Sequence, residues 1–229
     1  MASMRSFVQI LTLCSAIGSS LAATAKPALI LVPGAFHRAS VYDEVKAQLG
    51  DVGYERVDAI DLPSVGEDVA DVERIADTNT VTGLLETRLS NGEDVILVGN
   101  SYGATVIMEA VKEFEGRSTV SAHKMTEGEG SILGLIMSFK ALNATGTYIP
   151  YDGSFGTLYV IGEHDNSVSP AFAQSYYLDQ EGAKFEVETI AGDHVPMLSM
   201  PEAVVDIIRR FAGEKLGGKR EAESRGSEL

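Results

Sequence analysis

The sequence contains one cysteine and no tryptophan, and it is poor in basic residues. A single cysteine excludes an internal disulfide and any zinc or iron–sulfur site built from several cysteines. The 18 lysines and arginines are outnumbered by 33 aspartates and glutamates, which gives a formal net charge of -15. A surface of this charge repels nucleic acid and anionic lipid, so neither is an expected partner. These absences exclude classes of function without indicating one.

The first 25 residues predict a secretory signal rather than part of the fold. Arg5 is followed by a largely apolar run over residues 7–17 and then by small residues up to Ala23. This is the order of regions in a signal peptide, and the run is too short for stable membrane insertion. We predict a signal peptide at residues 1–23 and a secreted protein. Cleavage of this signal peptide would remove Cys14, the single cysteine. A buried N-terminal helix is the alternative.

Two other features fit a secreted protein. Asn143-Ala144-Thr145 forms a glycosylation sequon. Residues 217–229 are charged and almost free of apolar side chains, which predicts a disordered tail. Lys219-Arg220 in this tail resembles a dibasic processing site, with a solvated charge run as the alternative. The predicted folded domain is therefore residues 24–216.

Alternating strand and helix patterns indicate an α/β fold. Short apolar runs are typical of parallel strands buried on both faces, and amphipathic stretches between them indicate helices. Strands are predicted at 28–32, 95–98, 132–137 and 157–161, with further candidates at 56–60 and 185–190. Helices are predicted at 41–49, 69–89, 104–114 and 201–216. We expect a mostly parallel sheet of about six strands with helices on both faces, and a surface loop at residues 115–130.

The segment around Ser101 is the strongest chemical signal. A buried strand leads into Gly99-Asn100-Ser101-Tyr102-Gly103, and a helix follows. In this context G-x-S-x-G indicates a nucleophile elbow, a turn so tight that its neighbours must be small. The turn exposes the serine hydroxyl, and the backbone N–H of Tyr102 lies at a helix N-terminus that favours an oxyanion. Ser101 is the predicted nucleophile, with an ordinary turn serine as the alternative.

A serine hydroxyl needs a base, and the base needs an orienting carboxylate. Of the four histidines, His194 follows the last predicted strand, so its loop reaches the carboxyl end of the sheet where Ser101 lies. His194 is the predicted base, with a capping histidine on a surface loop as the alternative. Asp165 follows the strand at 157–161 and is the predicted acid. Glu163 is its nearest rival, and Asp193 is adjacent to His194 and poorly placed to reach the ring.

The loop after the first strand is the candidate for a second oxyanion donor. It contains Gly34, which allows close approach of the backbone, and then Ala35, whose N–H would point at the developing charge. A plain turn after a strand is the alternative. We find no sign of a metal or cofactor site.

These motifs resemble the α/β-hydrolase superfamily, in which the triad follows the chain order Ser, Asp, His. Within it, the chain is similar to small esterases related to plant methylesterases and hydroxynitrile lyases, whose first loop is roughly His-Gly-Ala-Trp-His. Here Pro33 replaces the first His and Phe36 the Trp. The hydroxynitrile lyases carry Thr at the position of Gly34 and Lys at that of Val195. The resemblance therefore implies ester hydrolysis rather than cyanohydrin cleavage.

The interval that holds a helical cap in these relatives is short. Only residues 140–155 separate the predicted strand 132–137 and its flank from the next strand, which is too few for a real lid. We expect a much reduced cap and a Ser101 open to solvent. A segment lost through a faulty gene model is the alternative.

The predicted function is that of a serine esterase acting on a small-molecule carboxylic ester. Ser101, Asp165 and His194 would form the triad, and Ala35 and Tyr102 the oxyanion hole. A lyase or C–C-bond hydrolase on the same scaffold, or a non-catalytic binding protein, remains the alternative.

Overall fold

A computed structural model describes residues 26–114, 120–125, 137–144, 146, 155–179, 181–182 and 184–216. The predicted signal peptide at 1–23 and the tail at 217–229 lie outside the described residues, as does Thr145 of the sequon. The predictions made for these segments stay predictions.

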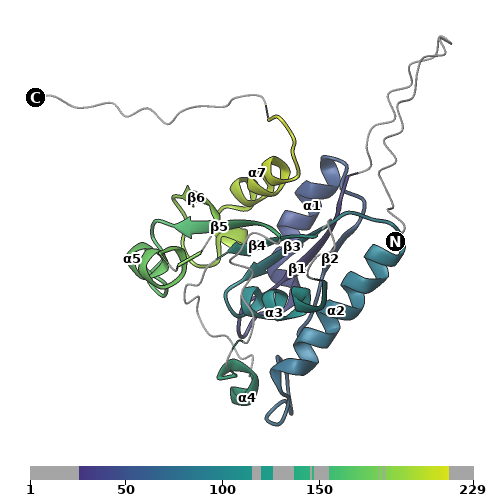
Figure 1. The fold of residues 1–229 in the computed structure, drawn as a ribbon, viewed down its shortest axis with the longest axis vertical. Helices are drawn as coiled ribbons and strands as arrows, with labels where there is room; N and C mark the ends of the chain where they lie inside the picture. The colour runs from purple at the N-terminus through teal and green to yellow at the C-terminus, as the bar shows by residue number, and fades with distance from the viewer. Residues whose placement is uncertain are drawn as a thin grey trace, which may run out of the picture.

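A six-stranded sheet forms the centre of the molecule (Figure 1). Its strand order is β2-β1-β3-β4-β5-β6, and every neighbouring pair is parallel. The strands are β1 (Ala28–Val32), β2 (Val57–Ala59), β3 (Val95–Asn100), β4 (Val120–Met125), β5 (Gly156–Gly162) and β6 (Glu186–Ile190). The prediction of an α/β fold with about six parallel strands is confirmed.

Helices cover both faces of this sheet. They are the 3-10 turn η1 (Ala39–Tyr42), α1 (Asp43–Asp51), α2 (Arg74–Ser90), α3 (Tyr102–Val111), the 3-10 turn η2 (Lys112–Phe114), α4 (Phe139–Leu142), α5 (Pro170–Ala173), the π-helical turn η3 (Gln174–Leu178), α6 (Pro196–Ser199) and α7 (Pro201–Phe211). Alternate residues of β1 point to opposite faces: Ile30 packs in the core with α2 and α3, and Leu31 in the core with α1 and α7. Both faces of β1 are therefore buried, which explains why its sequence is a continuous apolar run.

The fourth strand is not where the sequence pattern predicts it. The expected surface loop at 115–130 contains β4, which lies between β3 and β5, and His123 of this strand pairs with Val98 and Leu158. Of the predicted strand 132–137, only Met137 is described, and it forms an isolated antiparallel bridge with Val65. Hydrogen bonding to a neighbour on each side stabilises β4, although the surrounding segment is polar and gives no clear strand pattern. The interval before β5 is consequently longer than expected, running over residues 126–155.

Two helices are shorter than predicted. The helix expected at 69–89 begins only at Arg74, because Glu73 is still extended, with φ -95° and ψ 156°. The helix expected at 201–216 ends at Phe211. Gly213 follows with φ 86°, a left-handed conformation that favours glycine and ends the helix. This turn brings Glu214 back beside Arg209.

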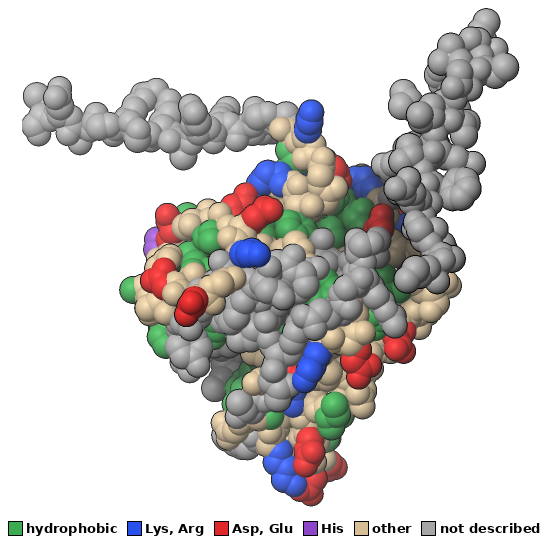
Figure 2. Space-filling model, in the orientation of Figure 1, with side chains coloured by type: hydrophobic (Ala, Val, Ile, Leu, Met, Phe, Trp, Pro, Cys, Tyr) green, Lys and Arg blue, Asp and Glu red, His purple; other side chains and the backbone are tan. Residues whose placement is uncertain are grey.

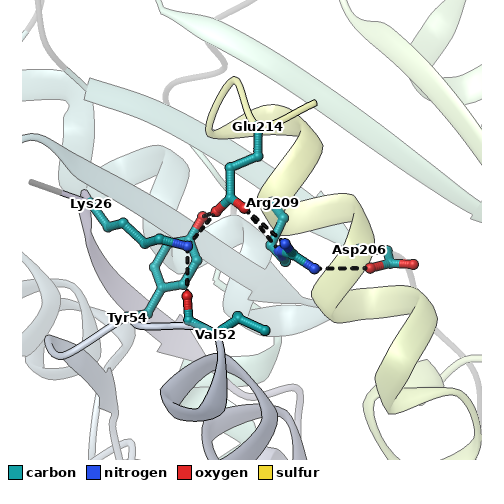
Figure 3. A network of polar contacts seen from close by, with 6 residues as sticks. All are labelled: Lys26, Val52, Tyr54, Asp206, Arg209 and Glu214. Carbon is teal, nitrogen blue, oxygen red and sulfur yellow. Dashed lines mark hydrogen bonds and ion pairs between the residues drawn. The ribbon is translucent and has the colours of Figure 1, made fainter. Parts of the chain in front are cut away.

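Glu214 joins the two ends of the folded domain (Figure 3). Its carboxylate accepts hydrogen bonds from Lys26 Nζ at 2.8 Å, the Tyr54 hydroxyl at 2.8 Å and Arg209 Nε at 3.0 Å. Lys26 also donates to the carbonyl of Val52 at 2.7 Å, beyond the end of α1. The residues before β1, the end of α1 and the end of α7 are therefore held by one carboxylate.

Replacing Glu214 by Gln is expected to lower the free energy of unfolding at pH 7 by about 1–2 kcal/mol, because charge-assisted hydrogen bonds are lost from a half-buried site. Partial burial alone would raise the pKa of Glu214, but the hydrogen bonds from Lys26, Tyr54 and Arg209 outweigh it and the pKa is lowered. The stabilisation is therefore present above the unfolded pKa of about 4.3 and is lost as the pH falls through the folded pKa.

Urea unfolding at pH 7 and below pH 4 checks this prediction. The difference between wild type and Glu214→Gln is expected to shrink at the lower pH. The exposed Glu55 provides a matched control, since Glu55→Gln should change stability by less than about 0.5 kcal/mol. Equal losses in the two variants would contradict the role given to Glu214.

The surface carries charges of both signs. On the face drawn in Figure 2, acidic and basic side chains are interspersed, with hydrophobic side chains scattered between them. In the described part of the chain, no helix is both long enough and apolar enough to cross a membrane.

Candidate active site

Ser101 is the single residue between strand β3 and helix α3. Its backbone has φ 55° and ψ -127°, a conformation that non-glycine residues rarely adopt. Such strain costs roughly 1–3 kcal/mol and is typical of functional turns. The strand thus passes into the helix within one residue, as the predicted elbow requires.

The glycines of the motif are required by close packing. A Cβ on Gly99 would lie 2.7 Å from the backbone N of Ala104, and a Cβ on Gly103 would lie 2.4 Å from the carbonyl oxygen of Pro33. Both neighbours are backbone atoms, which cannot move without shifting the sheet or the helix. Gly99 therefore allows the close approach of β3 to the start of α3, and Gly103 allows that of α3 to the end of β1.

His194 and Asp165 are in contact although they lie 29 residues apart. His194 Nδ1 is 3.1 Å from Asp165 Oδ2, and because a carboxylate only accepts, Nδ1 carries the proton and Nε2 is left as the basic nitrogen. The other carboxylate oxygen accepts the backbone N–H groups of Ser167 and Val168, each at 2.9 Å. These bonds fix the plane of the carboxylate and, through it, the imidazole.

The environment of His194 favours a neutral ring. Burial is the main reason why the pKa of the His194 imidazole lies well below its ordinary value, and the charge of His37 acts in the same direction. The Asp165 carboxylate opposes both effects, because it stabilises the imidazolium that forms during proton transfer. A ring that is neutral at pH 7 is able to accept a proton.

Ser101 and His194 lie on adjacent segments. Asn100, the residue before Ser101, donates from Nδ2 to the backbone carbonyl of His194 at 2.9 Å. Among the described residues, the hydroxyl of Ser101 forms no hydrogen bond to the His194 ring. Bonds between nucleophile and base are often long before substrate binds.

The segments that carry the predicted oxyanion donors both adjoin Ser101. The N–H of Tyr102 is the first of helix α3 and has no partner within the helix. The loop after β1 packs directly on Ser101, since a Cβ on Gly34 would lie 2.9 Å from the Ser101 Cβ. Phe36 follows Ala35 with φ 65°, so this loop is strained as well. Tyr102 directly follows Ser101, and Ala35 follows Gly34 in the loop that packs on it, so the role of both N–H groups as oxyanion donors stays a prediction.

The expectation that Ser101 is open to solvent is wrong. Its side chain is only 7% exposed, and His194 and Asp165 are 8% and 4% exposed. Two described segments lie close to the elbow: the Gly34 loop packs against Ser101, and the His194 loop is bonded to Asn100. The expectation of a much reduced cap stays a prediction, because most of residues 126–155 lie outside the described residues.

The rival acids lie elsewhere. Glu163 is exposed, and one oxygen of Asp193 accepts the N–H of Val195 at 3.0 Å and the hydroxyl of Ser199 at 3.1 Å. Asp193 therefore fixes the turn after His194. Of the other histidines, His164 is exposed.

Two residues of the site were not singled out from the sequence. His37 is close enough to His194 to lower its pKa, and its own Nδ1 lies 2.7 Å from the carbonyl of Ala35. Asn100 occupies the variable position of G-x-S-x-G. Their proximity to the motifs was visible in the sequence, but their contacts depend on the fold.

Metal ligands are not grouped in the described residues, where no cluster of three or more His, Cys, Asp or Glu side chains could hold an ion.

Comparison with known proteins shows which family the chain is similar to. The model of the alpha/beta hydrolase family matches residues 29–139, a stretch that includes Ser101 and ends before Asp165 and His194. The α/β hydrolase nvfD of Aspergillus novofumigatus is 33% identical over 111 residues, covering 48% of this chain and 42% of that protein. Methylesterase 1 of Arabidopsis thaliana is 31% identical over 149 residues, covering 62% and 54%. The chain thus spans about half the length of these two relatives.

The fold extends further than the sequence similarity. The crystal structure of a methylesterase from Arabidopsis is 16% identical, with a TM-score of 0.66, and the match covers 82% of this chain and 99% of that chain. At this identity the likeness shows the fold alone. The chain therefore has the α/β-hydrolase fold, and its sequence is similar to the alpha/beta hydrolase family and to plant methylesterases.

Proposed function

We propose that this protein is a serine hydrolase that cleaves carboxylic esters through an acyl-enzyme intermediate. The observation that carries the proposal is the Asp165–His194 pair, 3.1 Å apart and bonded through Asn100 to the turn that bears Ser101. A strained serine, an oriented imidazole and a carboxylate together form the arrangement needed to activate a hydroxyl. Esterases among the relatives support the choice of an ester as substrate.

In the proposed mechanism, the Ser101 hydroxyl attacks the ester carbonyl while His194 Nε2 takes its proton. Asp165 stabilises the imidazolium, and the N–H groups of Ala35 and Tyr102 donate to the tetrahedral oxyanion. The imidazolium then gives its proton to the leaving alcohol, and an acyl group remains on Ser101. Water, activated by His194, attacks the acyl carbon, and the carboxylic acid is released as Ser101 regains its proton.

A fluorophosphonate probe tests this proposal, because it reacts with activated serines. The purified full chain is expected to bind one probe molecule, which peptide mass spectrometry maps to the peptide of Ser101. The same protein should hydrolyse members of a panel of methyl and short-chain acyl esters. A folded protein that neither reacts with the probe nor hydrolyses any ester would overturn the proposal. Labelling without ester hydrolysis would favour the lyase alternative on the same scaffold.

A further inference from the structure

The side chain of Asn100 lies between three segments of the site. It is the last residue of β3, it precedes Ser101, and it is only 1% exposed. Its Nδ2 donates to the backbone carbonyl of His194 at 2.9 Å, across 94 residues of sequence. Its Oδ1 lies against Gly34, where a Cβ would approach it to 2.7 Å. One amide thus contacts the nucleophile turn, the base loop and the oxyanion loop.

An amide suits this position for a chemical reason. The carbonyl of His194 needs a donor, and a buried acceptor left without one costs about 1–3 kcal/mol. An aliphatic side chain of similar size would provide no donor, and an ionised carboxylate would repel the carbonyl. Asparagine provides the N–H on one side and a compact oxygen against Gly34 on the other.

The base loop has other anchors. The N–H of His164 bonds to the carbonyl of Gly192 at 3.0 Å, and Asp193 accepts the N–H of Val195 at 3.0 Å. These contacts hold the loop on both sides of His194 without Asn100. Loss of the Asn100 bond should therefore shift the backbone of His194 locally and leave the loop folded.

We propose that Asn100 is a positioning residue, which fixes the reach of the His194 ring toward the Ser101 hydroxyl by holding the His194 carbonyl. This inference rests on the proposed function of the triad. Asn100 acts through His194 and has no part in the chemistry itself. Its effect falls on the rate of proton transfer, so kcat should change more than KM.

The Asn100→Asp variant gives the sharpest test. A protonated carboxyl can donate to the His194 carbonyl as the amide does, whereas the ionised form cannot. The ratio of kcat between variant and wild type is therefore expected to fall by about tenfold or more as the pH rises and the new carboxyl ionises. Asn100→Leu has no donor at any pH, so its kcat should be lower than that of the wild type at every pH. The exposed Asn91 supplies the control, since Asn91→Asp makes the same chemical change away from the site.

Two measurements separate positioning from a general loss of structure. The fluorophosphonate probe titrates active sites, so kcat is expressed per functional molecule. The His194 ring proton, assigned in NMR spectra by its absence from His194→Gln, should titrate at higher pH in Asn100→Asp, because an added negative charge favours the imidazolium.

The outcomes distinguish this inference from the proposed function. A wild-type value of kcat per titrated site at every pH, in both Asn100 variants, would overturn the positioning role while the hydrolase proposal stands. An unchanged His194 titration in Asn100→Asp would overturn it even in a protein without esterase activity. Failure of the wild type to react with probe and esters would instead defeat the proposed function.

Discussion

The Ser101→Ala variant is expected to lose ester hydrolysis by about 10³-fold or more, together with all labelling by the fluorophosphonate probe. His194→Ala should cause a loss of similar size. The double variant should be no worse than either single one, because the nucleophile and its base perform one step together. Residual hydrolysis would come from substrate binding and the N–H groups of Ala35 and Tyr102.

Steady-state kinetics on the best ester of the panel, with unfolding curves for each variant, check this prediction. Removing the Ser101 hydroxyl takes away one atom and leaves the backbone conformation as strained as before, so stability should change little. Ser90→Ala, an exposed change at the end of α2, serves as the control and should retain full activity. Losses that multiply in the double variant would show that Ser101 and His194 act independently and would contradict the triad.

Local chemistry made the centre of this site predictable. The nucleophile elbow is recognisable from the five residues 99–103 alone, because the strand, the turn and the helix that form it are consecutive in the chain. His194 and Asp165 were found by the rule that residues after parallel strands meet at one edge of the sheet. The structure brings the two together at 3.1 Å.

Long-range effects explain what the sequence did not predict. Strand β4 lies in a polar segment and pairs with β3 and β5, so its formation depends on these neighbours more than on its own sequence pattern. The burial of Ser101, which is 7% exposed, likewise depends on how other segments pack around the elbow, and the Gly34 loop is one of its close neighbours. The role of Asn100 needs a partner 94 residues away. A periodic sequence pattern predicts which face of a helix or strand is buried. It does not predict that the Asn100 amide donates to the distant carbonyl of His194.

Gly103→Ala is expected to cause the largest loss of stability among the single substitutions considered. The new Cβ would lie 2.4 Å from the carbonyl oxygen of Pro33 and 2.5 Å from that of Val32. Both atoms belong to the backbone at the end of β1, so α3 and the central sheet must separate. A cost of about 4 kcal/mol or more is a large fraction of the 5–15 kcal/mol that stabilises a typical domain.

A matched glycine tests whether packing or the residue type is responsible. Gly83 is exposed within α2, and a Cβ there would meet no atom within 4 Å. Gly83→Ala should raise the free energy of unfolding by about 0.5–1 kcal/mol, because alanine is the better helix former. Urea unfolding followed by circular dichroism compares the two variants. Changes of less than about 1 kcal/mol in both would contradict the close contact at the elbow.

The same contact links stability to catalysis. The end of β1 continues through Pro33 into the loop that bears Ala35, and α3 begins with Tyr102. The methyl group added by Gly103→Ala would therefore push apart the two segments that supply the proposed oxyanion donors. Any folded fraction of Gly103→Ala should show a lower kcat per titrated site, since an N–H displaced by about 1 Å no longer matches the developing charge. Gly83→Ala should keep the wild-type kcat, because α2 supplies neither donor.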